Sequence, residues 1–419
     1  MTTSARRSLV GLLVVACLAW HALAVLDAWR DAWKDRTGRD FASYHYAVEV
    51  ARGGGDPYDV EALGEAARAD GARAGVHPFF YPPPFLLPMA WVAPLDLVTA
   101  YRAWFWLDEV FALAAFAVLA AWWRPLGPVV GPSVAAALAA LTAIPNNHVM
   151  GQMNLPVVLL VWLGAARAER GRDVQAGVML GAACMMKMSP ALLVALWLLH
   201  RRWRAVAAAV ATALVLEAAA LAVVPPASHL RFYAEVLPGF ASGRYNGLGV
   251  GIDLYGNHSL PNVWDALFPA GGRHLVLSET ARALSTASSL LLVGGLGVAL
   301  RRPGPDALAR AGAFAAVGVT MLLVPVFTYE HHLVWATPAV VAATAAVARG
   351  RLAPGWAAPL GLATAVWAFD LAALKRVALW IEAEAPFAAA AIRESKMVAL
   401  LVLLAAAVTL ARTRPEEGR

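Results

Sequence analysis

Asp40 is the first residue whose type and position suggest catalysis. It begins the polar segment 38–47, and its spacing to Tyr44 and Ala47 would put all three on one face of a helix. Because this segment closely follows an apolar run, we expect the helix to lie at the membrane surface, where a carboxylate can act as general base towards a hydroxyl. The alternative is a helix N-cap, which stabilises a helix by about 1 kcal/mol. On spacing alone the cap is the commoner explanation.

Lys187 is the second candidate, because it lies within the apolar segment 185–190. Placing a lysine in a membrane costs about 2.5–3.5 kcal/mol, so its ammonium group should meet an anion. The phosphate of a lipid-linked substrate is one candidate partner. A carboxylate of Asp108 or Glu109, which also lie within an apolar run, is the structural alternative. The sequence leaves both open.

Besides Lys187, seven polar side chains are candidates for contact with the substrate, although such residues are also common in turns and solvated loops. They are Tyr44, Tyr81, Gln152, Asn154, Arg244, Asn257 and Ser259. Three consecutive prolines follow Tyr81 and hold an extended backbone where the chain enters the membrane. Such a backbone is tolerated only against protein or a water-filled cavity, so we expect a cavity near the outer interface.

His331 and His332 close an apolar run with titratable groups. Paired histidines raise the possibility of a metal, but adjacent residues on a helix do not face one ligand point, and the i, i+4 spacing of a helical zinc site is missing. We therefore predict no metal and no cofactor. The sequence also lacks a P-loop and a strand-linked Gly-x-Gly-x-x-Gly motif. A transferred group should therefore arrive on a donor that lies in the membrane.

The composition places all these residues in a membrane protein, because the 419-residue chain is 60% hydrophobic and only 15% charged, against about 25% charged residues in soluble proteins. A spanning helix needs about 20 mainly apolar residues. We predict one all-α polytopic membrane domain over residues 1–419 that crosses the membrane about 12 times. The apolar runs fall near 8–26, 79–95, 98–123, 128–144, 154–168, 174–187, 190–200, 203–224, 281–300, 308–326, 332–348, 354–372 and 396–411.

Short arginine clusters between the apolar runs predict the orientation, because positive clusters stay in the cytoplasm. The clusters lie at 6–7, 201–204, 301–302, 349–351 and 412–414. This arrangement explains the net charge of +6 without a nucleic-acid partner. It leaves two long extracytoplasmic loops, 27–78 and 226–279, and a third exposed stretch after residue 372.

The middle of the chain allows two topologies. If 79–95 only dips into the membrane, the basic loop 167–172 is cytoplasmic and the polar loop 146–154 is extracytoplasmic. If 79–95 spans fully and 174–200 is one helix, these assignments reverse. The number of positive charges on the cytoplasmic side favours the first topology.

Together these segments resemble glycosyltransferase family 87, the polytopic GT-C enzymes that use polyprenyl-phosphate-mannose. The matching stretches occur in the family's order over roughly residues 38–335. They are Asp40-Phe41 with Tyr44 and Ala47, Gly55-Asp56-Pro57-Tyr58, Tyr81-Pro82-Pro83-Pro84-Phe85, Gly151-Gln152 with Asn154, Gly177 with Gly181, Lys187 with Pro190, and Asn257 with Ser259.

The resemblance implies a GT-C-like helical bundle in the bacterial plasma membrane. It also implies inverting transfer of a sugar, mannose in this family, from a polyprenyl-phosphate donor to a lipid or glycan hydroxyl on the extracytoplasmic face. Asp40 matches the family's base, and His331 or His332 matches an assisting histidine, with His331 slightly favoured. Lys187 is expected to stabilise the charge that develops on the leaving phosphate.

A transporter or flippase of a lipid-linked sugar is the alternative from another class, and a non-catalytic subunit of an envelope complex is a third. A transporter would also use the charges of Lys187, Asp108 and Glu109. Transporters often contain inverted repeats with matched broken helices, and this sequence shows none. Its polar residues also gather on one side of the membrane, so the sequence favours the transferase.

Overall fold

The computed structural model describes residues 3–72, 75–244 and 249–413, and within these ranges the chain is helical and has no β-strand. The all-α prediction is therefore confirmed. The first half of the chain contains α1 (Thr3–Lys34), α2 (Phe41–Arg52), α3 (Val60–Ala69), η1 (Pro83–Phe85), α4 (Leu86–Met89), η2 (Ala90–Val92), α5 (Leu97–Trp123), η3 (Arg124–Leu126), α6 (Val130–Ala140), α7 (Ala143–Met150), α8 (Asn154–Glu169), α9 (Asp173–Met186), α10 (Ala191–Leu199) and α11 (Trp203–Ala220).

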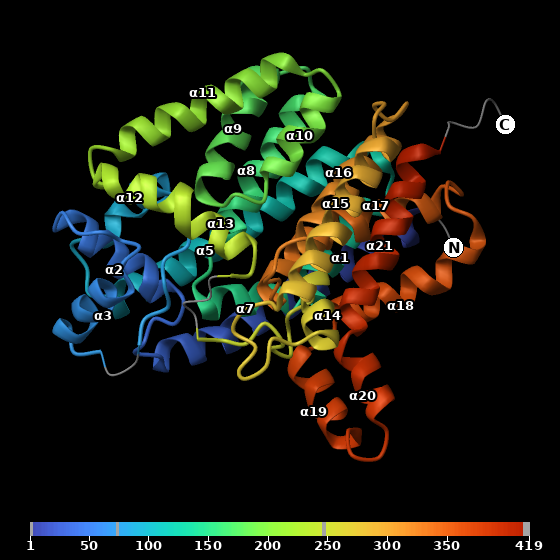
Figure 1. Cartoon of the computed structure of the whole chain (residues 1–419). Helices are drawn as coiled ribbons and strands as arrows, with labels where there is room; N and C mark the ends of the chain where they lie inside the picture. Colours follow the sequence, from blue (N-terminus) through green and yellow to red (C-terminus); the bar gives the residue numbers. More distant parts are fainter. Residues whose placement is uncertain (1–2, 73–74, 245–248, 414–419) are drawn as a thin grey trace.

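The second half of the chain completes the bundle shown in Figure 1. It contains α12 (Pro226–Arg231), η4 (Phe232–Val236), α13 (Leu237–Ala241), α14 (Leu260–Leu267), α15 (Glu279–Ala299), α16 (Ala307–Leu323), η5 (Glu330–Ala336), α17 (Thr337–Ala348), η6 (Pro354–Trp356), α18 (Ala357–Ala368), α19 (Leu371–Ile381), α20 (Pro386–Arg393) and α21 (Ser395–Arg412).

Six stretches among the described residues are long and apolar enough to cross a membrane. They are Ser8–Lys34, Leu97–Leu126, Trp203–Ala220, Glu279–Ala299, Glu330–Ala348 and Ser395–Arg412. A seventh is possible if α18 and α19, bent by 98°, form one broken span. The chain is thus a multi-pass membrane protein, but the predicted count of about 12 crossings is not confirmed. The first span continues to Lys34, past the expected start of the first outer loop at residue 27.

Two segments whose topology the sequence left open are interrupted. Within 79–95, the helical residues Pro83–Val92 rise about 15 Å, half the thickness of a hydrocarbon core of about 30 Å. Segment 174–200 forms two helices, α9 and α10, separated by residues 187–190. Lys187, at this break, has an extended backbone with φ −156° and ψ 128°. The break thus puts Lys187 where regular helix ends.

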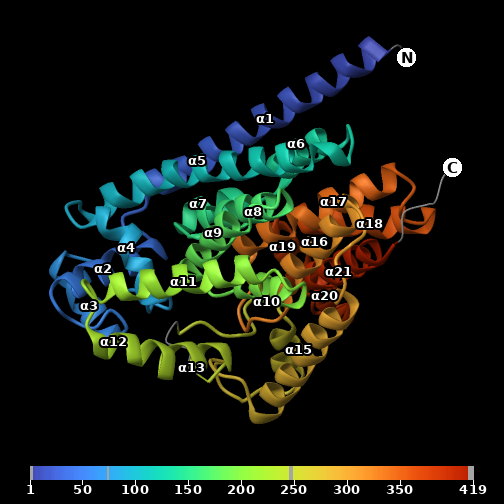
Figure 2. The same ribbon diagram turned by 90° about the horizontal axis from the view of Figure 1, so that it is seen from above.

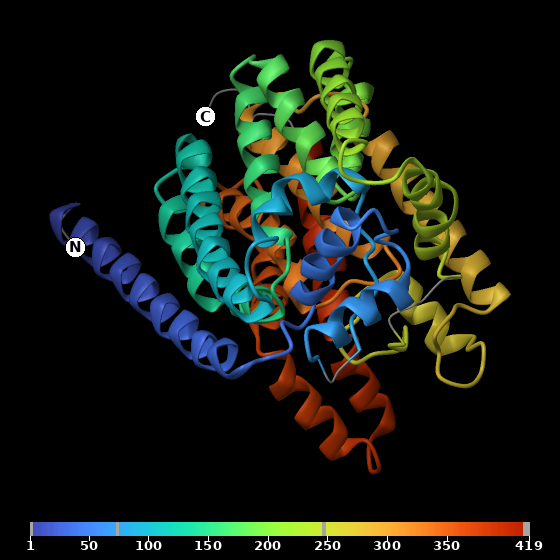
Figure 3. The ribbon, with the colours of Figure 1, turned by 90° about the vertical axis from the view of Figure 1, so that its left-hand side faces the viewer.

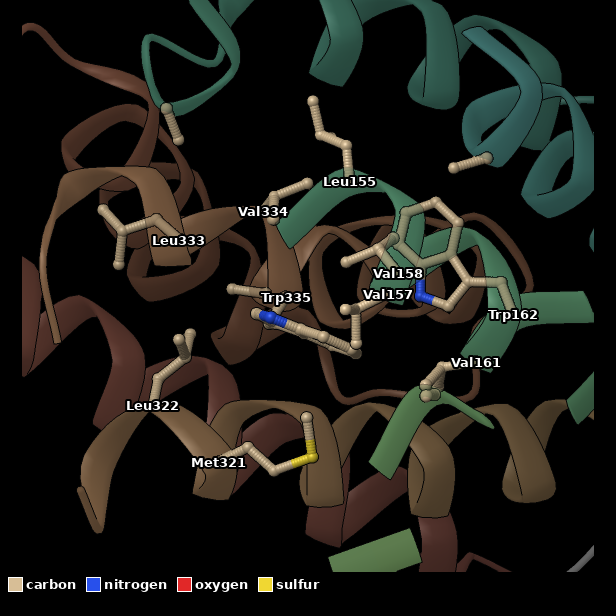
Figure 4. Close-up of a cluster of buried hydrophobic side chains, with 14 of the residues drawn as sticks. Leu155, Val157, Val158, Val161, Trp162, Met321, Leu322, Leu333, Val334 and Trp335 are labelled. Atoms are coloured by element: carbon tan, nitrogen blue, oxygen red, sulfur yellow. The ribbon is translucent and has the colours of Figure 1, made fainter. Parts of the chain in front are cut away.

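Close packing of small and apolar residues holds the bundle together. A Cβ at Gly177 or Gly181 of α9 would collide with backbone carbonyls of α11, so only glycine allows these two helices to approach as they do. Figure 4 shows side chains of α8, α16 and η5 meeting in one buried cluster that includes Trp162 and Trp335. Figures 2 and 3 show α1 along the edge of the bundle, with its N-terminal end projecting beyond it.

Arginines connect the helix ends on one side of the bundle. Each contact joins two segments that are distant in sequence, so these helix ends form one basic end of the molecule. The contacts are Arg202 to Asp173, Arg310 to Glu169, Arg349 to the carbonyl oxygen of Pro125, and Arg351 to Asp306. The opposite helix ends, including the C-terminus of α9 and the N-terminus of α21, surround the candidate site.

Candidate active site

A cavity of about 1140 Å³ lies at the end of the bundle opposite the arginine contacts. Its walls come from α1, α2, the segment 77–82, the connection from α7 to α8, the break after α9, and the segment that joins α16 to η5. The fold brings seven of the predicted site residues to this cavity. They are Asp40, Tyr44, Tyr81, Gln152, Lys187, His331 and His332.

Asp40 stands at the N-cap position of α2, but its side chain makes no capping hydrogen bond. Instead, Oδ2 accepts a 2.6 Å hydrogen bond from Nε2 of Gln152, and Oδ1 lies 3.6 Å from Nε2 of His77. The N-cap explanation of this side chain is therefore wrong. Burial raises the pKa of Asp40 above its usual 3.8, and the charge of His77 and the hydrogen bond from Gln152 oppose that rise.

Gly151 explains how Gln152 reaches Asp40. It ends α7 in the left-handed conformation, with φ +67°, which favours glycine. A Cβ at this position would lie 2.6 Å from Cβ of Phe41, the first residue of α2. The missing side chain thus lets the end of α7 pack directly on the start of α2.

A chain of hydroxyl groups holds the other side of Gln152. The hydroxyl of Tyr81 donates to Oε1 of Gln152 over 3.3 Å and lies 2.7 Å from the hydroxyl of Tyr44. Tyr58 donates to the backbone carbonyl of Tyr81 over 2.8 Å. With its oxygen occupied by Tyr81, the amide of Gln152 presents its NH₂ group to Asp40.

Lys187 has an amide partner rather than a carboxylate. Its Nζ donates a 2.6 Å hydrogen bond to Oδ1 of Asn154. Asp108 and Glu109 both bond to His148 instead, at 2.8 and 2.9 Å. The structural alternative in which these carboxylates pair with Lys187 is therefore wrong. An ammonium group has three donors, so Lys187 retains capacity for an anion in the cavity.

A buried polar network lies behind Gln152 and Lys187. Asn147 donates to Oδ2 of Asp108 over 2.6 Å and to the backbone carbonyl of Gln152 over 3.2 Å, while its own Oδ1 accepts from Asn154 over 2.9 Å. Glu109, the residue of α5 that follows Asp108, also bonds to His21 of α1 over 3.0 Å. The network ties α1, α5 and α7 together beneath the site.

The two predicted histidines differ in their partners. Nδ1 of His332 accepts a 3.0 Å hydrogen bond from the backbone of Tyr329, which leaves the ring proton on Nε2. His331 lines the cavity, and within the described part of the chain the structure shows no hydrogen bond to its ring. The sequence could not show this difference, because the hydrogen-bond partners of two adjacent histidines depend on the fold.

Glu330 and His77 also line the cavity, and neither was predicted from the sequence as a site residue. Lys396 donates a 2.5 Å charged hydrogen bond to Oε1 of Glu330, and both side chains are buried. Thr142 donates to the same oxygen over 2.8 Å. A lysine at the start of an apolar run was the available signal for Lys396, but its partner lies on another element.

Four of the eleven predicted residues lie outside the cavity wall. Asn154 is buried behind Lys187, and Arg244 is exposed. Asn257 donates to the carbonyl oxygens of Ile252 and Val326, and Ser259 donates to that of Val326. Asn257 and Ser259 therefore fix the loop before α14 against the segment that leads to η5.

The chain is a many-helix membrane bundle in which a partly buried carboxylate, Asp40, and the amino group of Lys187 line one cavity. Comparison with known proteins gives the class its name: a family model of glycosyltransferase family 87 matches residues 79–328, more than half of the chain. The chain belongs to glycosyltransferase family 87, so it is a glycosyltransferase, and the predicted family is confirmed.

One relative matches over most of its length. The relative, from Mycolicibacterium smegmatis, is described as a polyprenol-phosphate-mannose-dependent alpha-(1-2)-phosphatidylinositol mannoside mannosyltransferase. The two sequences are 27% identical over an alignment of 395 residues. The alignment covers 87% of this chain and 84% of the relative. No solved structure matches the chain.

Proposed function

We propose that this protein transfers mannose from a polyprenyl-phosphate donor to a hydroxyl of a lipid or glycan acceptor, with inversion at the anomeric carbon. The similarity to the mannosyltransferase of M. smegmatis supports the donor. The observation that carries the mechanism is the carboxylate of Asp40, which is released from helix capping and held by Gln152 in the same cavity as Lys187.

The reaction follows from the positions of these groups. The acceptor oxygen attacks the anomeric carbon as the bond from that carbon to the phosphate oxygen breaks, and the hydroxyl proton passes to Asp40. Oδ1 is the proton acceptor, because Oδ2 is occupied by Gln152. The phosphate leaves as an anion without needing a proton, and Lys187 and His331 stabilise its charge.

The cavity faces the extracytoplasmic side in this proposal. The arginine-connected helix ends support this orientation, because they lie opposite the cavity and positive residues favour the cytoplasmic side. The short helical segment Pro83–Val92 supports the topology in which 79–95 does not span. The cytoplasmic end then includes the loop 167–172, and the polar loop 146–154 lies outside.

The test is a transfer assay with the purified full-length protein in lipid vesicles. Radiolabelled polyprenyl-phosphate-mannose and a crude envelope lipid extract are supplied to the wild type and to Asp40→Asn. We expect label to reach a new glycolipid only with the wild type. Asp59→Asn is the matched control: Asp59 caps α3 by accepting from the backbone of Glu61 and Ala62, and asparagine caps equally well. Undiminished transfer by Asp40→Asn would exclude the proposed base.

A further inference from the structure

The helices α19 and α20 form a hairpin that stands out from the bundle. α19 turns by 98° from α18, and the chain returns through α20 to the start of α21. Figures 1 and 3 show the hairpin projecting from the body. The hairpin is thus set apart from the helices that pack in the bundle.

The base of the hairpin lies at the same end of the bundle as the cavity. Asp370, Leu371 and Lys375 line the cavity, and Arg393 donates to the backbone carbonyl of Asp253. The hairpin therefore projects from the end of the molecule that carries the cavity.

Exposed apolar side chains distinguish this hairpin from an ordinary solvated loop. Trp380 is 83% exposed and Phe387 is 91% exposed, and Val377 and Leu379 are also exposed. Tryptophan is enriched at the boundary between headgroups and acyl chains, and phenylalanine is apolar enough to enter the acyl chains. Ala378 of α19, in contrast, is buried, so α19 has an inner face as well as the exposed one.

The charges of the hairpin fit an anionic lipid surface. Arg376 lies four residues before Trp380 and thus on the same face of α19. Lys375 adds a second cation towards the cavity. At the tip, Glu382 and Glu384 are exposed, and carboxylates do not enter hydrocarbon without large cost. The tip should therefore stay in water while the aromatic side chains enter the lipid.

We propose that the α19–α20 hairpin lies on the bilayer surface beside the cavity mouth, with Trp380 and Phe387 among the lipid chains and Lys375 and Arg376 on lipid phosphates. The occupant of this face is the bilayer rather than a second protein. This proposal does not depend on the transferred sugar. It gives lipid substrates a contact surface next to the cavity.

Dye quenching in vesicles tests the position of each side chain. In the full-length Cys17→Ser/Cys184→Ala background, a bimane dye is attached to Phe387→Cys, Trp380→Cys or the matched tip control Ala383→Cys. The vesicles contain phosphatidylcholine and phosphatidylglycerol with or without brominated acyl chains. We expect brominated lipid to quench the dye at 387 and 380 several times more than at 383, and aqueous iodide to show the reverse order.

Quenching by iodide alone at both 387 and 380 would overturn the proposal. Protection from both quenchers, together with cross-linking between copies through residue 387, would replace the bilayer by a second protein. The cations have a separate test. Raising the phosphatidylglycerol fraction should increase lipid quenching at 387, and Lys375→Gln/Arg376→Gln should remove that increase; an unchanged increase would exclude their contact with phosphate.

Discussion

Gln152 donates a 2.6 Å hydrogen bond to Asp40, which lies 112 residues earlier in the chain. The bond holds Oδ2 of the carboxylate and leaves Oδ1 without a bond to Gln152, as the proposed base requires. Because Gln152 is itself held by Tyr81 and by the backbone contact from Asn147, the direction of the carboxylate is set before any substrate binds.

Gln152→Leu should therefore lower kcat about 10-fold to 100-fold, since small misplacements of a catalytic group have effects of this size. KM for the donor should change less, because Lys187 keeps its own partner. Steady-state kinetics of mannosyl transfer in vesicles measure both constants. Gln175→Leu, an exposed position on α9, is the control, and an equal kcat for both variants would contradict the positioning role.

The pH dependence of transfer should change in His77→Gln. The proposed base, Asp40, can accept a proton only when it is ionised, so activity should fall as the pH falls through its pKa. Burial raises this pKa above 3.8, and the positive charge of His77 lowers it. Removing His77 should raise the pKa further and move the acid limb of kcat/KM to higher pH. His77→Lys, which keeps a positive charge, should move it back, and an unmoved limb in His77→Gln would exclude this interaction.

Lys187→Met should reduce kcat about 100-fold to 1000-fold, as removal of a charge-stabilising donor typically does. Single-turnover measurements with labelled donor isolate the chemical step from release. Lys34→Met, at an exposed lysine near the end of α1, should keep wild-type turnover. A variant at 187 that changes only KM would show that the lysine holds the ground-state donor without contributing to the transition state.

Lys396→Met should destabilise the fold by about 3–5 kcal/mol, because it leaves a buried carboxylate without its cation. The pair is buried on both sides, with side-chain exposures of 1% for Lys396 and 7% for Glu330. Thermal unfolding in detergent should show a lower Tm for the single variant than for Glu330→Gln/Lys396→Met. If the two variants unfold at the same temperature, the destabilisation does not come from the unpaired charge.

The sequence predicted the helical class and the family, and it selected Asp40 and Lys187, which both line the cavity. These residues stand out locally: one is a carboxylate after an apolar run, and the other is a lysine inside one. Their partners could not be read in the same way. Gln152 meets Asp40, and Asn154 meets Lys187, only because α7 ends against α2 and α9 breaks at residue 187.

Asn257 and Ser259 show that the sequence can also select residues that do not line the cavity. A loop rich in amides and hydroxyls fits carbohydrate contact, yet both side chains are buried and bond to the protein backbone. Composition gives the number of donors and acceptors but not their direction. Only the path of the loop against residues 326–328 shows that these groups are already satisfied.

Asn147 connects the residues that hold Asp40 and Lys187, since its single amide bonds to Asp108, to the backbone of Gln152 and to Asn154. The two halves of the site are thus thermodynamically coupled through one side chain. Losses caused by changes at Gln152 and Asn154 should not add in a double-mutant cycle. A substitution at Asn147 would then shift the proposed base and the proposed phosphate contact together.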